Sequence, residues 1–209
     1  MGHANQKIRL SRSTPEAIRC FCNRRLTAFF LVTIAAVCSG GFRLFAQQSK
    51  PSEYQVKATY LYNFGRFVKW PGTLSGGKGE SFSVCVIGQD PFGAILDSTL
   101  AGETLDGKPV TVKRITKPQE GGECRILFIS ATEAKRLNEI LVALDENGVL
   151  TVSDMPDFTR RGGMIQFVRE GDKVRFEINL ASAENARLVL SSELLKVAAS
   201  VKRNGRSGD

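Results

Sequence analysis

Histidine is almost absent from this chain of 209 residues, which contains it once, as His3. Histidine is the side chain most often used for acid–base catalysis near neutral pH. No serine stands in a Gly-x-Ser-x-Gly elbow. The segment GQDPFG (88–93) lacks both the Gly-Lys-Ser/Thr ending of a phosphate loop and the closely spaced glycines of a dinucleotide site. The sequence therefore favours neither hydrolytic nor nucleotide chemistry.

Long apolar runs are missing as well. The most apolar stretch, LTAFFLVTIAAVC (26–38), has thirteen residues, fewer than the ~20 that span a bilayer as a helix. Six basic residues precede it, with Glu16 as the one acid among them. A basic head and a short apolar middle are typical of a secretory signal peptide. We therefore predict a signal peptide over 1–46, cleaved after Ala46 or Ser39, with an uncleaved amino-terminal anchor as the alternative.

Removal of residues 1–46 changes the composition. Seven of the 29 Lys and Arg residues and one of the 21 Asp and Glu residues lie there. The net charge falls from +8 to about +2, so charge gives no reason to expect a nucleic-acid partner. His3 and three of the five cysteines are lost too, which leaves Cys85 and Cys124. The remainder has the length of one domain, predicted at 47–201 and followed by a polar tail at 202–209.

Hydrophobic periodicity predicts alternating helices and strands in this remainder. A helix is expected at 53–69, with Val56, Tyr60, Phe64 and Phe67 on one stripe. Apolar runs at 82–88 and 124–130 predict strands that are covered on both faces. Further strands are expected at 109–115 and 149–154, with a short helix through Leu96 and a longer one at 131–145 capped by Thr132.

The last part of the chain has a different pattern of apolar residues. Strand patterns flank Gly171 and Asp172 and predict a hairpin. Helix signals start at Ser182, with a second segment from Ser191. The alternation followed by a hairpin predicts an α/β sandwich, with flanking helices and a mostly parallel mixed sheet. The C-terminal antiparallel hairpin is expected to form an edge of this sheet.

Eight segments in this order make the chain resemble the YfiR family of bacterial periplasmic proteins. They are EYQVKA (53–58), YLYNF (60–64), FVKWP (67–71), CVIG (85–88), ILFI (126–129), VLTVSD (149–154), FEINL (176–180) and SSELL (191–195). The resemblance implies a Rossmann-like fold without nucleotide chemistry. It also implies a periplasmic regulator that binds the sensor region of a membrane-bound diguanylate cyclase and holds that enzyme inactive. A homodimer and redox or small-molecule inputs are implied too. Some members carry a second cysteine pair after the fourth strand, but 155–164 contains no cysteine.

Cys85 lies inside one predicted strand and Cys124 opens another. In a flavodoxin-like strand order these two strands are neighbours, so the cysteines fall within the ~6 Å Cα separation of a disulfide. Three interpretations stay open: a structural disulfide, a reducible switch, and two unpaired buried thiols. A reducible switch would alter partner affinity with little change in melting.

Candidate binding residues lie in three places. In the last strand, Arg175, Glu177 and Asn179 alternate with apolar residues and form a polar face beside Gln166. That face is either solvated or a wall for a ligand, helix or partner. Trp70, at the end of the first helix, is either core or a protein-binding aromatic. Arg160 and Arg161 form a loop tip that is solvated or binds an anion or acidic partner.

These residues favour a protein without catalytic activity, cofactor or metal site. The acidic residues that come nearest to a metal-binding cluster are Asp154, Asp157 and Asp172, and we interpret all three as turn residues. The predicted function is an exported regulator that binds the periplasmic region of a membrane signalling protein and represses a diguanylate cyclase. The alternatives are a periplasmic small-molecule-binding module, an enzyme, and an envelope-assembly protein.

Overall fold

The first helix, α2 (Glu53–Phe67), opens the part of the chain that the computed structural model describes, namely residues 51–70, 80–144 and 147–203. Ser52 caps it, because its hydroxyl accepts a hydrogen bond from the Gln55 N–H at 3.2 Å. The helix ends before the expected Lys69, since Val68 turns to an extended conformation and pairs with Leu190. Val68–Lys69 (β1) and Val189–Leu190 (β9) thus form a separate two-stranded ribbon.

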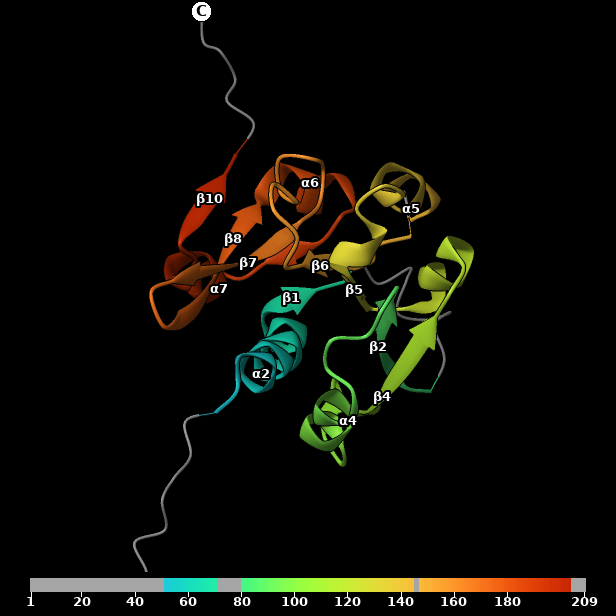
Figure 1. The fold of residues 1–209 in the computed structure, drawn as a ribbon. Helices are drawn as coiled ribbons and strands as arrows, with labels where there is room; N and C mark the ends of the chain where they lie inside the picture. Colours follow the sequence, from blue (N-terminus) through green and yellow to red (C-terminus); the bar gives the residue numbers. More distant parts are fainter. Residues whose placement is uncertain (1–50, 71–79, 145–146, 204–209) are drawn as a thin grey trace, which may run out of the picture. The chain divides into compact units, whose positions relative to one another are not determined.

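The central sheet has eight strands in the order β10-β8-β7-β6-β5-β2-β4-β3 (Figure 1). Strands β4, β2, β5, β6 and β7 run parallel, which confirms the mostly parallel α/β fold. Their bounds are β2 Phe82–Ile87, β3 Thr104–Leu105, β4 Lys108–Ile115, β5 Ile126–Ile129, β6 Leu150–Ser153, β7 Ile165–Glu170, β8 Lys173–Asn179 and β10 Ser200–Lys202.

Helices cover both faces of this sheet. Figure 1 shows α2 and α4 (Ala94–Leu100) on one side, and α5 (Leu137–Ala143) and α6 (Leu180–Asn185) on the other. All residues of β2, β5 and β6 are buried, as expected for strands with a core on each face. Phe64 and Phe128 belong to the core under α2, and Leu127 and Ile140 to the core under α5.

The hairpin prediction is confirmed, but its place in the sheet is corrected. β7 and β8 pair antiparallel, with Glu170 opposite Lys173. β8 is not an edge, because β10 pairs with it in parallel and places Lys202 opposite Asn179. Lys202, predicted to begin a polar tail, is therefore part of a strand. The helix expected from Ser182 begins at Leu180, and α7 (Ser192–Val197) is the expected second segment.

The helix predicted at 131–145 is shorter and interrupted. A 3-10 turn, η2 (Ala131–Glu133), precedes α5. Ser130, and not Thr132, caps this turn. The Thr132 hydroxyl is used elsewhere, because it accepts a hydrogen bond from the Gln89 N–H at 3.1 Å. The stripe predicted on α2 is also shifted: Ala58, Leu61 and Phe64 are fully buried, whereas Phe67 is 36% exposed.

Cys85 and Cys124 are joined by a disulfide with a Cα–Cα distance of 6.0 Å. Both residues are fully buried in the core under α5. The bond ties β2 to the residue that leads into β5, and this excludes the interpretation as two free thiols. The six-residue 3-10 helix η1 (Pro118–Glu123) directly precedes Cys124.

The predicted signal peptide at 1–46 lies outside the described residues, as do residues 71–79 and, in the predicted polar tail, residues 204–209. Within 51–70, 80–144 and 147–203, no helix is both long enough and apolar enough to cross a bilayer.

Candidate functional site

A buried lysine on α2 is the most unusual polar feature of the described residues. Lys57 is 3% exposed, and its ammonium group lies 2.7 Å from Asp154 Oδ2 and 2.6 Å from Glu53 Oε1. The Tyr54 hydroxyl donates to the same Asp154 oxygen at 3.3 Å, and Lys57 Nζ lies 4.5 Å from the centre of the Tyr54 ring. Asp154 directly follows β6, so the cluster ties α2 to the carboxyl edge of the sheet.

The electrostatics of this cluster keep Lys57 charged. Burial lowers the pKa of Lys57, but hydrogen bonds to Asp154 and Glu53 outweigh burial and raise the pKa above its ordinary value. The pKa of Tyr54 is raised by burial and then by the Asp154 charge. A protonated lysine between two carboxylates is neither a base nor a nucleophile. The cluster therefore anchors α2 instead of supplying a reactive group.

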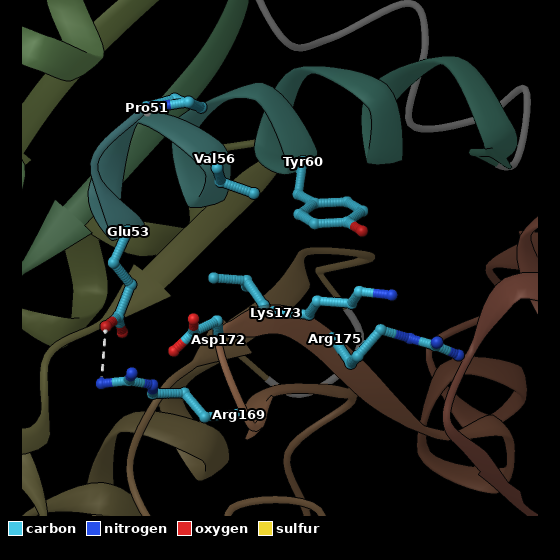
Figure 2. Close-up of a pocket in the computed structure, with 9 residues that line it drawn as sticks. Pro51, Glu53, Val56, Tyr60, Arg169, Asp172, Lys173 and Arg175 are labelled. Atoms are coloured by element: carbon cyan, nitrogen blue, oxygen red, sulfur yellow. Dashed lines mark ion pairs between the residues drawn. The ribbon is translucent and has the colours of Figure 1, made fainter. Parts of the chain in front are cut away.

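A groove lies beside this cluster, between α2 and the β7–β8 hairpin, and has a volume of about 460 Å³. Figure 2 shows Val56 and Tyr60 facing it from α2, and Glu53 pointing to Arg169 on the hairpin side. Glu53 and Arg169 approach to 3.5 Å. The groove and its immediate neighbours balance their charges: Arg169, Lys173, Arg175 and Lys57 against Glu53, Asp172, Glu170 and Asp154. It offers little electrostatic preference for a ligand of either sign.

The three residues of the polar face predicted on the last strand make different contacts. Arg175 lies 3.8 Å from Glu170 and borders the groove. Glu177 stands between Gln166 on β7 and Ser200 on β10. The amide of Asn179 caps α6, because its Oδ1 accepts from the Ser182 N–H at 3.2 Å. Its Nδ2 also donates to the Thr159 carbonyl at 2.9 Å. A binding role for these three residues stays a prediction.

The two arginines predicted to form a basic loop tip behave differently from each other. Arg160 is exposed and pairs with Asp157 at 3.1 Å. Arg161 instead donates to the Ala134 carbonyl at 2.6 Å, which ties this loop to the end of η2. Asp157 lies in a turn, as expected, whereas Asp154 lies directly after β6 and pairs with Lys57. In the described ranges, no group of three or more His, Cys, Asp and Glu residues is arranged to hold a metal ion.

The crevice where doubly wound sheets bind nucleotides lies between the carboxyl ends of β2 and β5. Gly88 follows β2 there with φ 88°, and a Cβ atom on it would lie 2.7 Å from Glu133 Cγ and 2.8 Å from Thr132 Oγ1. Side chains from the loop after β5 therefore pack against this glycine. The Gln89 N–H that follows already donates to Thr132.

Trp70 lies in a second cavity at the opposite, amino-terminal edge of the sheet. Its ring meets Phe82, the first residue of β2, edge-on at 5.3 Å between centroids. The cavity has a volume of about 550 Å³ and is also lined by Val68, Leu105 and five charged residues. The indole is half-buried, so Trp70 is neither fully core nor fully exposed.

Sequence reasoning missed Lys57 and the second cavity. A lysine between Val56 and Ala58 on an apolar helix face was the available signal for Lys57. The cavity combines residues that lie far apart in the sequence, from Gly65 to Arg125.

Comparison with known proteins gives one family. A domain model described as YfiR/HmsC-like matches residues 54–199. No curated protein matches the chain.

Solved structures match the chain at low identity. A conserved domain protein from Vibrio cholerae O1 biovar eltor has a TM-score of 0.52 and 13% identity, and the match covers 74% of this chain and 62% of that one. The ABC domain of a Streptococcus pneumoniae protein, in complex with L-Trp, has a TM-score of 0.42 and 10% identity, with 58% and 55% covered. The chain thus spans less than two thirds of each of these proteins.

Proposed function

The chain belongs to the YfiR/HmsC-like family, and on that premise we propose that it is an exported regulator that represses a membrane-bound diguanylate cyclase by binding the periplasmic region of that enzyme. The observation that carries this proposal is the family match over 54–199, which takes in nearly all described residues. Repression then means that the protein binds the inactive state of the cyclase more tightly than the active state.

Two further features support export. The sequence begins with the pattern of a signal peptide. The two cysteines that remain after its removal are bonded to each other, which suits an oxidising compartment. In the proposed domain organisation, residues 1–46 are removed and residues 47–201 form the regulatory domain.

We place the partner on the outer side of the β1/β9 ribbon. Val68 and Leu190 pair and point into the core, at 4% and 7% exposure. On the ribbon's outer side Val189 is 61% exposed, and Phe67, directly before β1, is 36% exposed. Ser191 donates to the Phe67 carbonyl at 2.8 Å, so Phe67 and Val189 are diagonal neighbours across the ribbon.

The chemistry of this surface fits a protein partner with an acidic rim. Single exposed apolar residues are ordinary, but an aromatic and a valine at diagonal positions of one ribbon face can supply the apolar centre that interfaces use. Arg66 and Lys69 border this centre and are exposed. A partner that covers Phe67 and Val189 therefore gains most when it presents carboxylates around an apolar patch.

Replacing Phe67 and Val189 together by serine is expected to weaken binding to the cyclase's periplasmic region about tenfold or more, because two apolar side chains leave the centre of the interface. Titration calorimetry with the periplasmic region of a membrane-bound diguanylate cyclase from the same cell measures the effect. Val142→Ser on α5 is the matched control, because Val142 is 67% exposed away from the ribbon.

Wild-type affinity in the control and a loss in the double variant support the docking surface. A double variant that binds like the wild type would refute that surface alone. A wild-type protein that binds no periplasmic cyclase region would refute the function.

A further inference from the structure

The cavity beside Trp70 carries an excess of positive charge. Arg66, Lys69, Lys108 and Arg125 line it, against the one carboxylate among its described lining residues, Asp106. These residues come from the end of α2, the β3–β4 turn and the start of β5. Counted by lining residues alone, this cavity has four cations against one carboxylate, whereas the groove at the carboxyl edge has three against two.

Two of the cations, Arg125 and Lys108, stand on backbone that is hydrogen-bonded into the sheet or follows a tight turn. Arg125 is 6% exposed. Its N–H donates to the Ser83 carbonyl at 2.9 Å, and its carbonyl accepts from the Leu150 N–H at 2.9 Å. Lys108 follows a two-residue turn in which Asp106 and Gly107 both have positive φ, 51° and 73°, as tight hairpins require. A preorganised set of charges loses little entropy when a ligand binds.

The remaining wall is apolar and aromatic. Trp70 and Phe82 meet edge-on, and Val68 and Leu105 complete the wall. The Trp70 Nε1–H is buried, and no residue in the described ranges accepts a hydrogen bond from it. A buried donor without an acceptor is costly and rare in native structures.

We infer that this cavity binds a small organic anion that combines an apolar or aromatic body with a carboxylate, sulfonate or phosphate group. The body packs against Trp70 and Phe82, and the anionic group lies among Arg66, Lys108 and Arg125. A volume of about 550 Å³ is in the usual range for small-molecule sites. This inference goes beyond the proposed function, because it concerns the isolated protein and needs no partner.

Binding is tested with the fluorescent anion 8-anilinonaphthalene-1-sulfonate. Trp70 is the only tryptophan of the chain, so energy transfer from Trp70 reports that the probe is bound to the protein, and the variants below test whether it lies in this cavity. We expect the energy transfer to saturate as the probe concentration rises, with the stoichiometry of one binding site. The neutral analogue N-phenyl-1-naphthylamine, which lacks the sulfonate, is expected to bind about tenfold more weakly, because it gains no charge-assisted hydrogen bond.

Two variants shift the affinity in opposite directions. Lys108→Gln removes one cation and is expected to weaken sulfonate binding about fivefold, whereas Asp106→Asn removes the one carboxylate and is expected to tighten it about fivefold. Asparagine adopts positive φ readily, so Asp106→Asn preserves the turn. Neither change is expected to alter binding of the neutral analogue. Arg169→Gln, in the balanced groove, is the control and is expected to bind like the wild type.

Opposite effects of Lys108→Gln and Asp106→Asn establish the anion site. The inference is overturned if the probe does not saturate, if both variants bind like the wild type, or if Arg169→Gln lowers affinity as much as Lys108→Gln. It is also overturned if the neutral analogue binds as tightly as the sulfonate. Thermal melting of each variant shows whether a loss of binding reflects a loss of fold.

Discussion

Replacing Lys57 by methionine is expected to lower the free energy of unfolding by about 3 kcal/mol, the lower end of the range for breaking a buried ion pair. The ammonium lies between Asp154 and Glu53 at 2.7 and 2.6 Å. Its removal leaves the Asp154 carboxylate, whose side chain is only 16% exposed, without its counter-charge. The residual exposure lets water solvate that carboxylate in part, which is why the upper end of the range is not expected. Urea denaturation at neutral pH measures the change.

A second variant separates the ion pair from simple packing. Lys57→Met combined with Asp154→Leu removes both charges and is expected to recover most of the loss, because an apolar pair can replace a buried ion pair at little cost. Arg160→Met is the matched surface control. Its pair with Asp157 is exposed, so a loss below about 0.5 kcal/mol is expected. If Lys57→Met lost no more than this control, the cluster would not anchor α2.

Opening the Cys85–Cys124 bond is expected to lower the free energy of unfolding by about 4 kcal/mol on the chain-entropy model for a closed loop of this length. The two cysteines are 39 positions apart, and both are fully buried. Cys85→Ala/Cys124→Ala removes the bond without adding buried polar groups. Denaturant unfolding of this double variant, compared with the oxidised wild type, measures the loss.

The same experiment distinguishes a structural disulfide from a redox switch. A structural bond lowers stability, and the wild type refolded under reducing conditions is expected to match the alanine variant. A switch changes affinity for the cyclase and leaves stability almost unaltered. A loss of less than about 1 kcal/mol together with altered affinity would therefore reject the structural role.

The sequence predicts the layered fold because burial on two faces leaves a local signature. The runs at Phe82–Ile87 and Ile126–Ile129 contain almost no polar residues, and both are strands with every residue buried. The neighbouring positions of Cys85 and Cys124 follow from the strand order. The hairpin follows from alternation about Gly171, where positive φ suits glycine.

Features that depend on distant partners are not predictable in this way. Ser200–Lys202 has no strand pattern of its own and becomes β10 only because β8 offers it an edge. Lys57 lies 97 positions from Asp154, so its partner is visible only in the folded chain. Asn179 and Arg161 hydrogen-bond to backbone groups of other segments. Local sequence gave no sign of these contacts, and a binding role for the two residues stays a prediction.

Cyclic-di-GMP in the native cell tests the central claim most directly. Deletion of this chain is expected to raise the cyclic-di-GMP level, because the cyclase loses its repressor. The rise is expected to vanish when the gene for the membrane cyclase is deleted as well, and to be reversed by the wild-type chain but not by the Phe67→Ser/Val189→Ser variant. An unchanged cyclic-di-GMP level after deletion of the chain, in cells that express the cyclase, would contradict the account.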